Sequence, residues 1–104
     1  MKTYNKLVRD KIPAIIAADH KICDTEILND AEYIKMLDEK LIEELSEYQE
    51  SKEIEELADM LEVMYAIAKS RGVSISDLES IRADKALKRG GFEDKIFLNS
   101  VTEK

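Results

Sequence analysis

The spacing of hydrophobic and polar positions along the chain predicts a mostly helical protein. Between residues 29 and 48, apolar side chains recur at steps of three and four, which places them on one face of an α-helix. These side chains are Ile34, Leu37, Leu41, Leu45 and Tyr48. Asn29 and Glu32 have the spacing of a capping box, so this long helix is expected to begin there. Residues 50–53, with the sequence ESKE, are expected to interrupt it.

Two further helices are predicted in the second half of the chain. The first covers residues 54–71, and Gly72 supplies its C-terminal stop. Ser76 and Glu79 form another capping box, which predicts a last helix that ends at Gly90.

The two ends of the chain are expected to be less regular. Asp10 is predicted to cap a short helix that reaches about Ala18, with Pro13 tolerated in its first turn. Residues 4–8 are expected to be extended, and residues 20–28 and 92–101 are expected either to be extended or to form short strands.

These elements together predict a single all-α domain over residues 1–104. The expected architecture is an antiparallel bundle of about four helices with short extended N- and C-terminal segments. The helix over residues 54–71 is apolar around most of its circumference, so one neighbouring helix cannot cover it. A second copy of the chain would complete the burial, which predicts a homodimer or homotetramer.

Composition and charge narrow the function. Hydrophobic residues make up 44% and charged residues 38%, which is typical of a folded domain. The net charge of −7 argues against non-specific binding to nucleic acid. No apolar run is long enough for a transmembrane helix, so no membrane partner is expected. The single cysteine, Cys23, cannot form an internal disulfide, and the N-terminus lacks the apolar stretch of a signal peptide. A cytoplasmic protein is expected.

Four acidic residues stand out as candidate metal ligands. Glu44 and Glu47 form one i,i+3 pair, and Glu56 and Asp59 form another. Residues three apart share a helix face. Almost every residue after Asp59 in its helix is apolar, so the face that carries Glu56 and Asp59 is expected to be covered. If the two helices form an antiparallel hairpin, the four carboxylates approach one another near its turn.

Carboxylates buried at short range require compensation by cations or by proton uptake. The helix over residues 54–71 has no basic residue between Lys52 and Lys69 that could supply it. Hard carboxylate oxygens select Mg²⁺, Mn²⁺ or Ca²⁺, and no histidine or cysteine is nearby to favour zinc. The alternative is an ordinary solvated acidic surface, which is how most such runs occur.

The same residues resemble a known family. EELSE followed by ELAD is similar to the EExxE…ExxD signature of the all-α nucleoside triphosphate pyrophosphohydrolases, which include MazG-like proteins, dimeric dUTPases and phosphoribosyl-ATP pyrophosphohydrolases. The segments YNKLVRDKIPAII, ELADMLEVMYAIAKSRG and KALKRGGFEDKIFL resemble a compact MazG-related branch. Only eight residues separate Glu47 from Glu56, which predicts a tight turn.

The resemblance implies an enzyme with a nucleotide substrate. It implies that Glu44, Glu47, Glu56 and Asp59 bind Mg²⁺, with Mn²⁺ as an alternative ion. It further implies cleavage of a nucleoside triphosphate between the α- and β-phosphates, which yields a nucleoside monophosphate and pyrophosphate. Glu44 and Glu47 are the candidates for activating the attacking water.

Basic residues are expected to contact the phosphates. The candidates are Arg9, Lys85, Lys88 and Arg89. Glu62 is either an additional ligand or an exposed acid, and Glu43 is expected to be solvated. Two alternatives stay open: a phosphoribosyl-ATP pyrophosphohydrolase of histidine biosynthesis, and a non-catalytic metal-binding helical oligomer.

Overall fold

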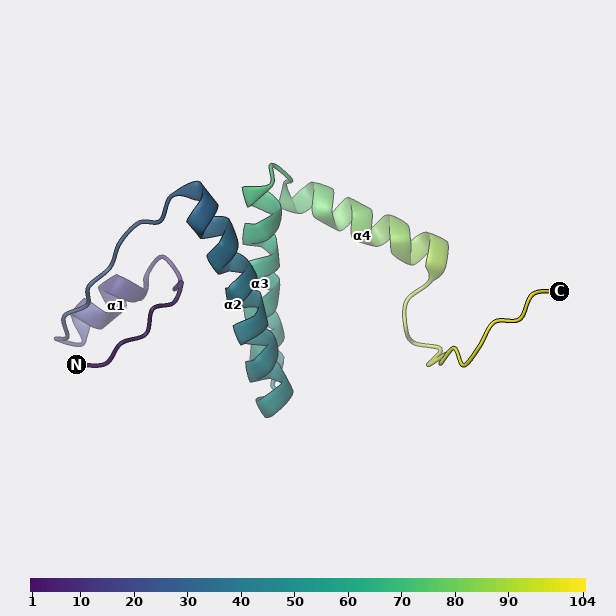
Figure 1. The fold of residues 1–104 in the computed structure, drawn as a ribbon, viewed down its shortest axis with the longest axis horizontal. Coiled ribbons are helices and arrows are strands. Elements are labelled where there is room, and N and C mark those ends of the chain that lie inside the picture. The colour runs from purple at the N-terminus through teal and green to yellow at the C-terminus, as the bar shows by residue number, and fades with distance from the viewer.

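The fold is all-α, as the sequence predicts. The computed structural model describes residues 1–104 and contains four helices and no strand. They are α1 (Ile12–Ala18), α2 (Asp30–Ser51), α3 (Ile54–Ser70) and α4 (Ile75–Arg89) (Figure 1). Residues 21–28 and 95–104 have no regular structure and residues 92–94 form a bend and a turn, so neither predicted segment, 20–28 or 92–101, contains a strand.

The centre of the fold is a hairpin of α2 and α3, and local interactions define its ends. The Asn29 side chain accepts a hydrogen bond from the Glu32 N–H at 2.9 Å, which confirms Asn29 as the cap. The Glu32 carboxylate bonds back to the Asn29 side-chain amide at 2.7 Å and not to the Asn29 backbone N–H of a full capping box. At the other end, Lys52 adopts a left-handed conformation with φ 61° and donates its N–H to the Tyr48 carbonyl at 2.7 Å. Only Lys52 and Glu53 connect the two helices, so the predicted tight turn is confirmed.

Helix α4 begins two residues earlier than the sequence predicts. Its cap is Ser74 and not Ser76. The Ser74 hydroxyl accepts a hydrogen bond from the Asp77 N–H at 3.0 Å. Both serines precede an acid by three residues, so the pattern alone does not distinguish them. The earlier start brings Ile75 into the first turn, where it is half-buried. The helix ends before Gly90, as predicted.

The prediction that Asp10 caps α1 is wrong. Lys11 occupies the cap position with a helical backbone, and no side chain accepts a hydrogen bond there. The Arg9 carbonyl instead accepts a hydrogen bond from the Ile12 N–H at 3.1 Å, so a backbone turn starts the helix. Pro13 lies in the first turn, as expected, and the helix ends at Ala18.

The chain buries little of itself outside the hairpin. The buried hydrophobic residues are Leu37 on α2 and Val63 and Ala68 on α3. Helix α4 packs only against α3, and α1 packs against no other helix. Figure 1 shows α4 and the C-terminal arm pointing away from the hairpin, on the side opposite α1. The radius of gyration is 18.5 Å, against about 13 Å for a compact chain of this length.

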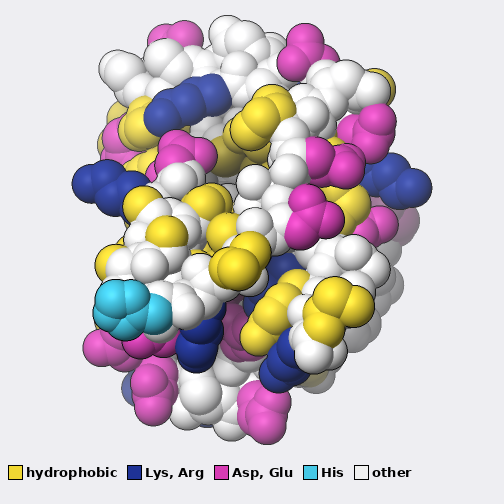
Figure 2. All heavy atoms as spheres, turned by 90° about the vertical axis from the view of Figure 1, so that its left-hand side faces the viewer, with side chains coloured by type: hydrophobic (Ala, Val, Ile, Leu, Met, Phe, Trp, Pro, Cys, Tyr) yellow, Lys and Arg dark blue, Asp and Glu magenta, His cyan; other side chains and the backbone are white.

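Apolar side chains remain uncovered along α3. Ile54, Leu57, Leu61 and Met64 follow one another at steps of three and four, and are 39–73% exposed. The accessible surface is 9637 Å², whereas a compact monomer of this mass exposes roughly 5,900 Å². Hydrophobic side chains are also visible among charged ones on the α1 side (Figure 2). None of the four helices combines the length and the apolar character needed to cross a bilayer.

Candidate metal centre

The hairpin brings three of the four predicted acidic residues together across α2 and α3, whereas Glu47 joins only a group on α2. Glu44 on α2 and Glu56 and Asp59 on α3 place carboxylate oxygens within 4.8 Å of one another. A second group of the same size joins Glu43, Glu44 and Glu47, all on α2. Glu44 belongs to both groups and links them into one cluster of five carboxylates. The group with Glu56 and Asp59 follows from the antiparallel pairing of α2 and α3, and the other group follows from the helical spacing of α2.

Glu44 is the most buried charged residue of the chain. It is only 6% exposed, and its Oε2 atom is buried without a hydrogen-bond partner. Glu56 Oε2 is buried and unpartnered in the same way. Burial raises the pKa of Glu44 above its ordinary value, and the neighbouring Glu47 raises this pKa further. Such oxygens are costly to desolvate unless a cation or a donor satisfies them.

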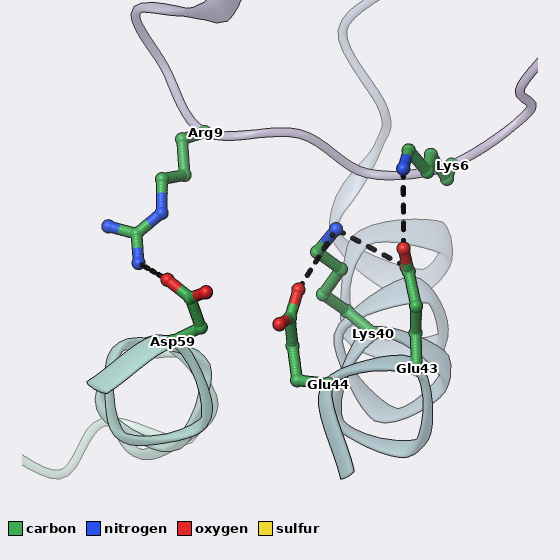
Figure 3. A network of polar contacts seen from close by, with 6 residues as sticks. All are labelled: Lys6, Arg9, Lys40, Glu43, Glu44 and Asp59. Atoms are coloured by element: carbon green, nitrogen blue, oxygen red, sulfur yellow. Dashed lines mark hydrogen bonds and ion pairs between the residues drawn. The ribbon is translucent and has the colours of Figure 1, made fainter. Parts of the chain in front are cut away.

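Three basic side chains offset part of the negative charge (Figure 3). Arg9 Nη2 lies 2.6 Å from Asp59 Oδ1. Lys40 Nζ lies 3.2 Å from Glu43 Oε2 and 3.4 Å from Glu44 Oε1, and Lys6 Nζ lies 3.3 Å from Glu43 Oε1. These counter-charges come from α2 and from the N-terminal segment, so the absence of basic residues along the third helix does not reveal them.

The compensation is incomplete. The cluster holds five carboxylates and three basic side chains, so its formal charge is −2 when all are ionised. The Oε2 atoms of Glu44 and Glu56 are buried without a hydrogen-bond partner, so neither is satisfied by the three basic side chains. An all-carboxylate donor set suits Mg²⁺ or Mn²⁺, so the residues present fit a divalent cation that takes oxygen ligands.

Two neighbouring acids differ in their surroundings. The prediction that Glu43 is solvated is wrong, because this side chain is half-buried between Lys6 and Lys40. Glu62 is exposed and lies outside both carboxylate groups. It lines a separate shallow groove of about 340 Å³ together with Asp10, Tyr33, Ala66, Lys69 and Ser70. The exposed-acid alternative for Glu62 is therefore favoured.

The predicted phosphate-binding residues divide into two sets. Arg9 lies in the cluster through its ion pair with Asp59. Lys85, Lys88 and Arg89 occupy the last turns of α4, are exposed, and do not meet the cluster within one chain, because α4 diverges from the hairpin (Figure 1). Lys88 pairs with Asp84 of its own helix at 3.1 Å.

Comparison with protein-family models, with curated proteins and with solved structures gave no match to this chain. The resemblance to MazG-like pyrophosphohydrolases therefore rests on the quoted residues, and the case for a metal site rests on the geometry of the cluster.

Proposed function

We propose that this chain is a Mg²⁺-dependent nucleotide pyrophosphohydrolase, which cleaves a nucleoside triphosphate between its α- and β-phosphates. The observation that carries the proposal is the pair of buried, unpartnered oxygens of Glu44 and Glu56, in a group whose ligand oxygens lie within 4.8 Å. The EExxE…ExxD spacing gives the family resemblance, and the hairpin accounts physically for why that spacing gathers the carboxylates.

Each acid has a role that follows from its position. Glu44, Glu56 and Asp59 would hold the metal, because their oxygens converge from two helices. Bound Mg²⁺ neutralises phosphate charge and orients the triphosphate. Glu47 is exposed at the rim of the cluster, where its carboxylate can accept a proton from water. The water oxygen bonds to the α-phosphorus, and the bond between this phosphorus and the oxygen that bridges it to the β-phosphate breaks. Pyrophosphate leaves with the bridging oxygen, and the nucleoside monophosphate keeps the oxygen of water.

The proposed enzyme is a homodimer or homotetramer. The uncovered stripe of α3, from Ile54 to Met64, is the surface that supports this assembly. The accessible surface exceeds that of a compact monomer by roughly 3,700 Å², enough to supply the roughly 1,000–2,500 Å² per chain of an obligate dimer. A second copy is also the means by which the basic end of α4 could reach a carboxylate cluster.

The test is pyrophosphate release, measured with and without Mg²⁺ across a panel of nucleoside triphosphates that also includes phosphoribosyl-ATP. Glu56→Gln should lower the rate at least about tenfold, because it removes one ligand from the metal. Glu55→Gln is the matched control, since Glu55 is the exposed neighbour of Glu56 on the same helix. Metal binding by calorimetry without release of pyrophosphate from any nucleotide would contradict the enzymatic role and favour the non-catalytic metal-binding oligomer.

A further inference from the structure

The N-terminal segment lies across the carboxylate cluster and joins its two helices. Lys6 pairs with Glu43 on α2, and Arg9 pairs with Asp59 on α3, so the N-terminal segment crosses from one helix to the other (Figure 3). Leu7, between them, is half-buried. Residues 6–9 thus form a strap over the cluster.

The strap is attached by side chains alone. No backbone hydrogen bond joins residues 6–9 to α2 or α3. The Arg9 and Asp59 side chains are 57% and 39% exposed, and those of Lys6 and Glu43 are 40% and 30% exposed. Ion pairs that reach solvent to this extent are weak. The strap therefore has the contacts of a segment that can leave the cluster while the hairpin stays folded.

Arg9 pairs with a carboxylate that a metal ion would need. Its Nη2 lies 2.6 Å from Oδ1 of Asp59, whose carboxylate belongs to the group that includes Glu44 and Glu56. A guanidinium and a divalent cation held by the same carboxylate repel each other strongly. Lys6, three residues before Arg9, pairs with Glu43, so Arg9 released from Asp59 would stay next to the cluster, where it could pair with an anion.

We propose that Arg9 is the resident counter-ion of the carboxylate cluster, displaced from Asp59 by a divalent cation and then used to bind the phosphate groups that this cation holds. The strap thus exchanges one partner for another: a carboxylate in the metal-free protein, a phosphate in the loaded one. This inference rests on the proposed function, because it assumes the metal site. Arginine suits both partners, since its planar guanidinium matches carboxylate and phosphate geometry.

The proposal predicts opposite effects of one substitution on two affinities. Arg9→Gln removes the competitor, so Mn²⁺ alone should bind about two- to fivefold more tightly, the range expected for an exposed ion pair. The same variant should bind inorganic pyrophosphate, in saturating Mn²⁺, about tenfold more weakly, because it loses a charge-assisted contact. A merely structural role would weaken both affinities together.

The experiment is calorimetric titration of Mn²⁺, and then of pyrophosphate, into wild type, Arg9→Gln, Arg9→Lys and Lys11→Gln. Lys11→Gln is the matched control, because it removes an equal charge two residues away that has no ion-pair partner. Arg9→Lys should return both affinities toward wild type. Identical Mn²⁺ affinity in Arg9→Gln and Lys11→Gln would overturn the role of the strap and leave the metal site standing. A wild-type chain that binds no Mn²⁺ would overturn the metal site itself.

Discussion

Replacing Glu44 by glutamine should stabilise the metal-free protein and weaken its response to Mg²⁺. In the folded chain Glu44 is 6% exposed, and its Oε2 atom has no partner. Leaving a buried charged oxygen unpaired costs about 1–3 kcal/mol. Lys40, 3.4 Å from the other oxygen, offsets part of that cost, and it keeps Glu43 as a partner at 3.2 Å in the variant. We therefore expect a net gain of about 1 kcal/mol in the free energy of unfolding.

Thermal unfolding followed by circular dichroism measures this effect. In EDTA, at one fixed chain concentration, about 1 kcal/mol corresponds to a rise in Tm of about 4–8 °C for a domain of this size. Mg²⁺ at a hundred times its Kd should then stabilise wild type by about 2.7 kcal/mol and Glu44→Gln by much less. The order of the two Tm values therefore reverses between EDTA and Mg²⁺.

Two results would refute this reasoning. A Glu44→Gln protein that is less stable than wild type in EDTA would mean that the fold already satisfies the carboxylate. Equal stabilisation of both proteins by Mg²⁺ would mean that Glu44 is not a ligand. Glu55→Gln, which removes an exposed acid from α3, should leave both the EDTA and the Mg²⁺ values close to those of wild type.

The remaining predictions concern pH, assembly and helix capping. The pKa of Glu44 is raised above its ordinary value of 4.5, so the stability that its protonated form gives the metal-free protein is full below pH 4.5 and is lost as pH rises through the folded pKa. Denaturant titrations should therefore show that the extra free energy of unfolding of Glu44→Gln over wild type vanishes in acid. Leu61→Glu places a charge in the uncovered stripe of α3, so sedimentation should give a mass near 11.9 kDa for the variant and at least twice that for wild type. Ser74→Ala should cost about 1 kcal/mol of stability in urea melts, and Ser76→Ala should cost much less.

The helix ends that the sequence predicts well are those with strong local chemistry. Asn29 caps α2 as its spacing from Glu32 predicts, because both hydrogen bonds between these residues are made within one turn. Gly90 ends α4 for a similar reason, since its positive φ of 82° suits a residue without a side chain. Where two capping residues compete, as Ser74 and Ser76 do, the choice depends on packing that the local pattern does not contain.

The sequence alone predicts the acids that meet between α2 and α3, but it predicts neither the place of Glu43 in the cluster nor the ion pairs with basic side chains. The i,i+3 spacing and the tight turn are enough to bring Glu44, Glu56 and Asp59 together, because both are local features of the hairpin. Arg9 and Asp59, in contrast, are separated by fifty positions, and no periodicity relates them. Lys40 was within reach of a local argument, since it precedes Glu44 by one helical turn.

The two-residue connection between α2 and α3 has a consequence for how the protein folds. Glu44 and Asp59 are only fifteen positions apart, so we expect them to meet early and fast, because closing the short loop costs little entropy. We then expect the carboxylates to repel one another as the hairpin nucleates, before α4 or a second copy has docked. A divalent cation present during refolding should lower that kinetic barrier, so the cluster would act on the rate of folding as well as on the stability of the folded chain.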